Sequence, residues 1–345
     1  MQKLITEIHL THLRENAVAF RRLTGSKLCA VVKADAYGHG AIGVVNALYG
    51  IADFFAVAII EEAIEIKTAA SGKDILVFTP PVFEDEALVA IRNGFVLSVT
   101  DVPTAKLIAN VCEKYSLTAR VHIKVNTGMN RYGVSGGALG KVCAFLSRFR
   151  RVKVEGIFSH LYTTDEEISR GQRAEFIRSI AIAKGYFPSL IAHLGATYGA
   201  TLGKDFAFDA VRIGLGLYGY TPTPCQELSL KPVMRVYATC VGTRMYHGGG
   251  VGYGTSARTA GLKGKRIALL RAGYADGTGL SPYAYSDLSP LNRFCMDVGF
   301  VQSGIMRGEE KELFFSAEEL AKAKGTIVYE TLCLLGLRAE RRYKE

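Results

Sequence analysis

Eight short apolar runs recur between residues 28 and 219, and stretches with helical periodicity connect them. The runs are rich in β-branched and aromatic residues, which favour strands. Strands that alternate with helices form parallel sheets, and eight such units within about 200 residues are typical of a (β/α)8 TIM-type barrel. The expected strands cover residues 28–34, 54–58, 74–80, 95–100, 119–127, 151–160, 190–196 and 210–219.

A doubly wound open sheet is the alternative architecture for the same alternation. Such sheets commonly bind dinucleotides through a GxGxxG turn after the first strand. Here residues 35–40, which directly follow the first expected strand, read Asp-Ala-Tyr-Gly-His-Gly, and a GxGxxG sequence begins only at Gly38, four residues beyond the end of that strand. We therefore expect the barrel, with connecting helices that include residues 40–49, 61–70, 84–93, 102–115 and 166–184.

The pattern of the sequence changes after Tyr220. Glycine clusters and short β-type runs replace the helical periodicity, so we expect a barrel domain over residues 10–221 and a mostly β domain over residues 222–345. Residues 1–9 are a candidate strand of the second domain. One helix is expected at 316–325, because a serine precedes it and a glycine ends it.

Composition narrows the classes of function. No apolar run approaches the roughly 18 residues of a membrane span, and the N-terminus lacks the pattern of a signal peptide. The seven cysteines are scattered without the spacing of a zinc site, so we expect free thiols in a reducing cytoplasm and no metal. The net charge of +10 is spread along the chain without a nucleic-acid-binding motif. An enzyme that binds small anionic molecules therefore fits better than a nucleic-acid-binding protein.

Ionisable and polar residues stand at the expected C-terminal ends of the strands, where such barrels carry their chemistry. A lysine there can pair with an acid, hold an anion or form a Schiff base, and the last requires a lowered pKa. A nearby arginine or low solvent access would lower it. The glycines and Thr197 after the last two strands suit a phosphate site. The residues at the strand ends are Lys33, Asn126, His160, His193 and Arg212, with Arg131 in the loop after the fifth strand.

Six motifs, in order VVKADAYGHG, KVNTGMNRYG, VRIGLGLYG, VGYGTS, AGYADG and CMD, resemble those of the alanine racemase family. The resemblance covers nearly the whole chain. It implies a pyridoxal phosphate barrel followed by a β domain, in a cytoplasmic isomerase that supplies D-alanine for the cell wall. It also implies a homodimer with shared active sites, a small amino-acid substrate, and no nucleic-acid or membrane partner.

The same resemblance implies two catalytic bases. Lys33 would hold the cofactor covalently and act on one face of the substrate, and Tyr253, from the other subunit, would act on the opposite face. Racemisation needs both, because a proton leaves one face of Cα and another returns to the opposite face. A tyrosine starts near a pKa of about 10 and needs cationic or hydrogen-bonding help to act as a base. His160 would sit behind Tyr253 and supply that help.

The remaining roles also follow from the resemblance. Arg212, oriented by His193, would meet the pyridine nitrogen and leave it unprotonated, because arginine almost never gives up its proton. The other implied contacts are Tyr37, Thr197 and the backbone of Gly214 and Leu215 at the phosphate, Arg131 at the phenolic oxygen and the substrate, Met296 near the substrate carboxylate, and Tyr274 at the entrance.

Three positions depart from the family pattern, and a fourth, Lys124, leaves two interpretations open. Asn126 stands where the family usually has aspartate, and Ala196 lies within GAT where ANS is usual. Leu337 falls where a tyrosine normally narrows the pocket. Alternatively, Tyr343 or Tyr283 takes the place of that missing tyrosine. Lys124 is often carbamylated in the family to hold the following arginine, and the alternative is an unmodified lysine with Asn126 or an anion holding Arg131.

Other functions remain open on the sequence alone. A decarboxylase of this fold would use a cysteine in place of Tyr253, and a non-enzymatic cofactor carrier would consist of a single barrel. A serine or broad-specificity racemase would keep the same two bases. The VGYGTS motif and the added β domain favour alanine racemisation over the first two.

Overall fold

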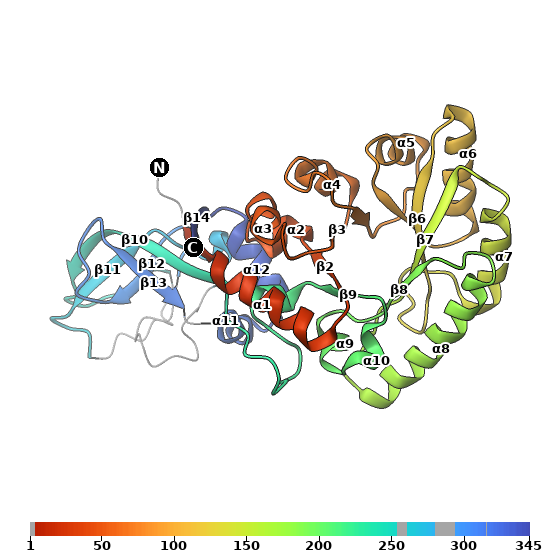
Figure 1. Ribbon diagram of the computed structural model, residues 1–345. Helices are drawn as coiled ribbons and strands as arrows, with labels where there is room; N and C mark the ends of the chain where they lie inside the picture. Colours follow the sequence, from red (N-terminus) through yellow and green to blue (C-terminus); the bar gives the residue numbers. More distant parts are fainter. Residues whose placement is uncertain (1–3, 254–260, 280–293, 315) are drawn as a thin grey trace. The chain divides into compact units, whose positions relative to one another are not determined.

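The computed structural model describes residues 4–253, 261–279, 294–314 and 316–345. It forms two compact units (Figure 1). The barrel unit contains His12–Ala34 and Val44–Lys231. The β unit contains Met1–Thr11, Asp35–Gly43 and Pro232–Glu345, so a short segment from the barrel region of the sequence belongs to it.

Eight parallel strands form the barrel unit in the order β8-β7-β6-β5-β4-β3-β2-β9. Two backbone hydrogen bonds join the β8 and β9 segments, including a residue beside each strand, from Asp209 N to Ala192 O (3.0 Å) and from Arg212 N to Gly195 O (2.9 Å). These bonds bring the two ends of the sheet together, and the expected (β/α)8 barrel is confirmed. The strands are β2 (Lys27–Val31), β3 (Phe54–Val57), β4 (Ile75–Val77), β5 (Val96–Val99), β6 (Ala119–Lys124), β7 (Val152–Phe158), β8 (Ile191–His193) and β9 (Ala210–Ile213).

Helices cover the outside of the barrel, and the five expected connecting helices are confirmed (Figure 1). Local capping explains where two of them begin. The Asp101 side chain accepts a hydrogen bond from Thr104 N (2.7 Å) at α6, and Asp165 accepts one from Ile168 N (2.9 Å) at α8. The helices are α1 (Leu10–Thr24), α3 (Ala41–Leu48), α4 (Ile60–Ile66), α5 (Glu84–Arg92), α6 (Val102–Tyr115), α7 (Gly136–Leu146), α8 (Glu166–Lys184), α9 (Thr197–Thr201), α10 (Lys204–Ala207) and the short η1 (Leu215–Tyr218).

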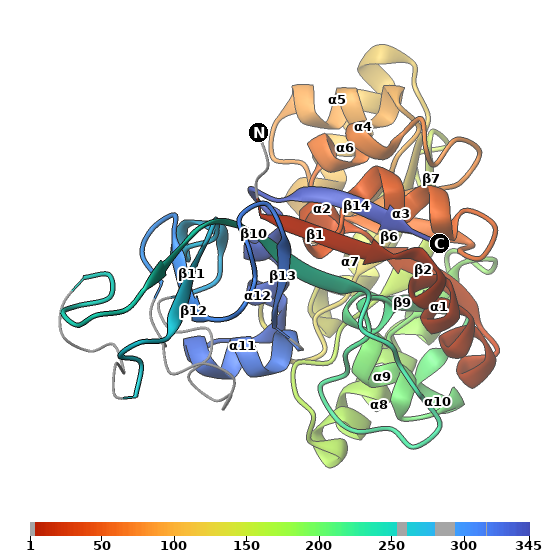
Figure 2. The same ribbon diagram turned by 90° about the vertical axis from the view of Figure 1, so that its left-hand side faces the viewer.

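A six-stranded sheet forms the centre of the β unit, with the path β12-β11-β10-β1-β14 and β13 paired to β10. Strand β1 (Ile5–His9) runs antiparallel to β10 (Met234–Met245) and parallel to β14 (Glu340–Lys344), so it lies between them (Figure 2). The first and last of the described strands are therefore hydrogen-bonded neighbours. The other strands are β11 (Arg266–Leu270), β12 (Gly299–Gln302) and β13 (Glu310–Phe314).

Helices and a short 3-10 turn accompany this sheet. Helix α11 (Ala317–Lys324) begins at Ser316, whose hydroxyl accepts from Glu319 N (3.1 Å), and ends at Gly325 in the left-handed conformation. This confirms the expected helix. The described part of the unit also contains helix α12 (Val328–Gly336) and the turn η2 (Tyr274–Asp276).

All seven cysteines lie in described segments and are free thiols. Among the described residues, no helix has both the length and the apolar character needed to cross a membrane.

Candidate active site

Lys33 begins a turn with unusual backbone geometry. Strand β2 ends at Val31, and α2 (Lys33–Tyr37) follows. The φ angles of residues 34–37 lie between 51° and 55°, the left-handed region, although none of them is glycine. This conformation costs an L-residue about 1–2 kcal/mol, so contacts from the surrounding fold must hold the turn in place. Such strain is typical of functional sites.

Glu62 of α4 fixes the start of this turn within the barrel unit. Its carboxylate accepts hydrogen bonds from Ala34 N (2.7 Å) and Ala58 N (2.7 Å). The residue that follows Lys33 is therefore tied to the helix after the next strand. Sequence reasoning missed Glu62, because a glutamate in the first turn of a helix reads as an ordinary cap.

Arg212 lies at the end of β9 and is only 3% exposed. Its Nη1 donates to His193 O (2.7 Å) and faces His193 Nδ1 (3.0 Å), while Nη2 donates to Ser159 O (2.6 Å) and Leu194 O (3.0 Å). Burial lowers the pKa of Arg212 to about 10, so the guanidinium remains charged at neutral pH. The predicted pairing of His193 with Arg212 is therefore present in the geometry.

His122 extends this contact into the barrel interior. Its Nδ1 lies 2.9 Å from His193 Nε2. Because Arg212 can only donate, His193 Nδ1 must accept, and its proton must then sit on Nε2 and point to His122. Burial lowers the pKa of His122 to about 3, so it is neutral and its Nδ1 can accept a hydrogen bond from His193 Nε2. The arginine thus fixes the tautomers of two histidines in series.

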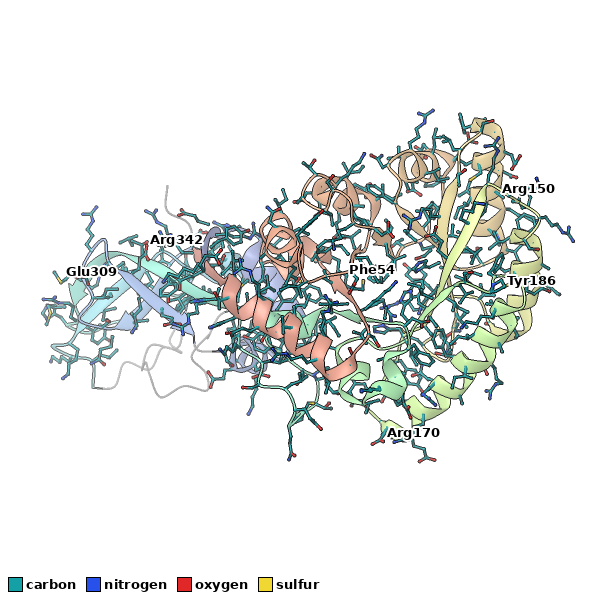
Figure 3. All side chains as sticks on the ribbon, viewed as in Figure 1. Phe54, Arg150, Arg170, Tyr186, Glu309 and Arg342 are labelled. Carbon is teal, nitrogen blue, oxygen red and sulfur yellow. The ribbon has the colours of Figure 1, made fainter. Side chains whose placement is uncertain are left out.

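Packing holds the rings of His122 and His193 in place. A Cβ atom at Gly156 would lie 2.7 Å from the His122 ring, so glycine is required there. The His193 ring stacks on Phe158 (5.0 Å between centroids) and meets Phe54 edge-on (6.2 Å), which Figure 3 labels. The strand periodicity of two, which places His122 on the face of Lys124, was the signal that could have identified this residue.

Positive charge gathers around His160. Burial lowers its pKa well below the usual value, and Arg212, Lys124, Arg131 and Lys33 lower it further. The Lys124 amine lies 4.9 Å from the centre of the Phe158 ring, and its pKa is also well below normal through burial, Arg212 and Arg131. Lys33, Arg131 and Arg212 therefore supply positive charge around a histidine that is itself neutral, which fits an anionic ligand.

Thr197 and the segment after β9 are joined directly. Gly216 N donates to the Thr197 hydroxyl (3.0 Å), so the start of α9 is linked to η1. A Cβ atom at Gly216 would lie 2.4 Å from the Phe20 ring. The buried backbone at Leu215 is thus held close to Thr197, as the predicted phosphate site requires.

Asn126 shapes its own loop and does not hold Arg131. Its side-chain oxygen accepts from Gly128 N (3.1 Å) and Asn130 N (3.0 Å), and its amide donates to Asn130 Oδ1 (2.9 Å). Both lone pairs of the oxygen are engaged. The possibility that Asn126 holds Arg131 is therefore disfavoured.

Tyr253, Tyr274 and Met296 come together within the β unit. Tyr274 N donates to Cys295 O (3.1 Å), and Ala275 N donates to Met296 O (3.1 Å). A Cβ atom at Gly252 would lie 3.1 Å from Cys295 Sγ, which brings the Tyr253 segment to the same place. Tyr253 is 74% exposed and Met296 is 52% exposed. Three separated motifs thus form one exposed group on this unit.

Comparison with known families covers both units. The model described as alanine racemase, N-terminal domain, matches residues 8–222, and the model described as alanine racemase, C-terminal domain, matches residues 233–343. The chain belongs to the alanine racemase family. The resemblance in the six sequence motifs is thereby confirmed.

Individual alanine racemases agree with this assignment. The chain is 32% identical over 367 residues to alanine racemase 2 of Oceanobacillus iheyensis, covering 98% of this chain and 92% of that protein. It resembles the structure of alanine racemase from Clostridium difficile 630 with a TM-score of 0.87 and 28% identity, over 99% and 96% of the two chains. It also matches a complex of that racemase with cycloserine, with a TM-score of 0.84.

Proposed function

We propose that the protein is an alanine racemase that interconverts L- and D-alanine, with pyridoxal phosphate bound at the C-terminal end of the barrel. Membership of the family supports the activity. The observation that carries the assignment is the positive charge around His160: Arg212 Nη2 lies 3.4 Å from His160 Nδ1, and Lys33, placed directly after the first barrel strand, adds to it.

This donor set fits pyridoxal phosphate. The cofactor carries a phosphate and a phenolic oxygen, and Lys33, Arg212 and Arg131 supply positive charge. Lys33 would bind it covalently, Arg131 would meet the phenolic oxygen, and Tyr37, Thr197 and the Gly214–Leu215 backbone would hold the phosphate. When bound, the cofactor stabilises the carbanion left at Cα after proton removal.

The residues of the chain control the protons. Arg212 remains protonated and faces five acceptors of the barrel, so it would donate a hydrogen bond to the pyridine nitrogen without transferring a proton. Lys33 acts as the base on one face of Cα. Tyr253 acts on the other face, and its high exposure suits a residue supplied to a partner subunit.

The homodimer and a cytoplasmic location belong to the same proposal. Tyr253, Tyr274 and Met296 would reach the partner's barrel, with Met296 near the substrate carboxylate and Tyr274 at the entrance. Seven free thiols suit a reducing compartment.

A direct assay tests this function. Purified protein supplied with pyridoxal phosphate and L-alanine should produce D-alanine without releasing carbon dioxide, and the reverse reaction should also proceed. Release of carbon dioxide would indicate a decarboxylase. Cofactor binding without either reaction would indicate a carrier, although the presence of the family's C-terminal domain disfavours that alternative.

Lys124 is predicted to be carbamylated. Its burial favours the neutral amine, which can add to carbon dioxide with loss of one proton and yield a carbamate. The new negative charge would pair with Arg131, which Asn126 does not hold. Isotope-labelled carbon dioxide should give a carbamate carbon signal in the nuclear magnetic resonance spectrum, and Lys124→Arg should remove it. Absence of the signal in wild-type protein would leave the unmodified lysine as the correct alternative.

Leu337 is predicted to permit a side reaction with serine. It lies at the end of α12 and is 76% exposed in the single chain. An apolar wall rejects one added hydroxyl by no more than about a hundredfold, and a missing tyrosine hydroxyl removes a bond worth about 0.5–1.5 kcal/mol. Leu337→Tyr should therefore raise cofactor affinity by roughly tenfold at most, and it should raise the alanine-to-serine ratio of kcat/KM because the added ring narrows the pocket.

An unchanged ratio would show that Leu337 does not line the pocket. Tyr343 and Tyr283 are the two candidate replacements. Tyr343 is already engaged, because its hydroxyl donates to His39 O (3.3 Å) and its ring packs against Gly40 and Gly43. Tyr283 lies outside the described residues.

A further inference from the structure

We propose that Arg341 is a positioning residue for the phosphate of the cofactor, because it holds the left-handed turn that carries Tyr37. This inference rests on the proposed function for the identity of the ligand. Arg341 lies in the β unit, as do residues 35–43, and 303 positions separate it from Gly38 in the sequence.

The Arg341 side chain contacts both ends of the turn and the end of helix α12. The Arg341 guanidinium forms an ion pair with the Asp35 carboxylate, and its Nε donates to Gly38 O (3.1 Å). Its Nη2 donates to Gly336 O (2.9 Å) at the end of α12. The other oxygen of Asp35 accepts from Ala41 N (2.7 Å). Arg341 therefore connects the start of the turn, its end and the neighbouring helix.

Close backbone packing fixes the same segment against α12. A Cβ atom at Gly38 would lie 2.4 Å from Leu332 O, and one at Gly336 would lie 2.3 Å from Gly38 O. Tyr343, two residues after Arg341 on the strand, packs on Gly40 and Gly43. Alternate residues of a strand share a face, so β14 presents both side chains to the turn.

The arrangement of all these hydrogen bonds holds the turn more effectively than the ion pair alone would. Both charged groups are partly exposed, and such pairs contribute little to stability by themselves. The guanidinium, however, also engages two backbone carbonyls in a fixed arrangement that lysine cannot reproduce. Residues 34–37 are strained in their left-handed conformation, so loss of these bonds should let the turn relax and move the buried Tyr37.

Two ligands separate this role from a general defect. Arg341→Gln should weaken binding of pyridoxal phosphate by about tenfold, the value of one charge-assisted hydrogen bond. Binding of pyridoxal, which lacks the phosphate, should be unchanged, because Lys33 and Arg212 are intact. Arg341→Lys should give a smaller loss. In a Tyr37→Phe background, Arg341→Gln should cause no additional loss, since it acts through the Tyr37 hydroxyl.

Arg342, labelled in Figure 3, provides the matched control. It follows Arg341 on the same strand and pairs with Glu310 (2.8 Å) and Glu340 (3.4 Å). Arg342→Gln should bind both ligands as the wild type does. If Arg341→Gln does not fold, the comparison uses Arg341→Lys.

Two results would overturn the inference: both ligands bind the Arg341 variant as they bind wild type, or both weaken equally. Failure of the wild-type protein to bind either ligand would instead contradict the proposed function.

Discussion

Replacing Lys33 with alanine is expected to abolish racemisation in both directions and to remove the visible absorption of the bound cofactor. The amine is proposed as both the covalent attachment and one of the two bases. Loss of a positioned base alone costs about 10²–10⁴ in rate, and loss of the attachment adds to it. The measurements are D- and L-alanine turnover and the absorption spectrum after addition of pyridoxal phosphate.

Lys27→Ala is a suitable control for this variant. Lys27 is exposed at the opposite end of the same strand, β2. It should retain both turnover and the absorption band. If Lys33→Ala kept normal turnover, the attachment point would have to be another lysine, and Lys124, whose burial favours a neutral amine, would be the next to test.

Tyr253→Phe is expected to lower turnover of L-alanine by about 10²–10⁴, because it removes one proton-transferring group and leaves the ring in place. Cofactor binding should survive. The proton of D-alanine should still exchange with deuterated solvent, since Lys33 acts on that face. The expected product is therefore deuterated D-alanine with little L-alanine.

An exposed tyrosine outside this group gives the comparison. Tyr186 lies in the segment after α8 and is labelled in Figure 3, and Tyr186→Phe should behave as wild type. Retention of most L-alanine turnover in Tyr253→Phe would assign the second base to another residue. Loss of exchange on both faces would indicate that the tyrosine supports the site without transferring a proton.

Periodicity in the sequence was sufficient to predict the barrel and the polar residues at its strand ends. The sequence signal at these positions is local, because an apolar strand that ends on a lysine, histidine or arginine is unusual whatever surrounds it. The contact between His193 and Arg212 followed from the resemblance and agrees with the geometry.

Other features depend on distant partners and had no local signal. The left-handed turn uses Ala34, Asp35 and Ala36, residues that favour other conformations in isolation, so only its surroundings can impose it. The contact between His122 and His193 requires the register of β6, β7 and β8. The assignment of residues 35–43 to the β unit depends on a charged strand, ERRYK, which does not resemble a buried partner in sequence.

The bond between Asp35 and Arg341 joins positions 306 residues apart, and this separation constrains the order in which the protein folds. Synthesis proceeds from the N-terminus, and domains generally fold as their sequence emerges. The barrel strands are complete by residue 213, whereas the turn beside Lys33 lacks its partners until β14 has been made. A nascent chain can therefore assemble its barrel well before it can bind the phosphate of the cofactor. Such non-local pairing is intrinsically slow, so we expect competence for the cofactor to be among the last properties that the polypeptide acquires.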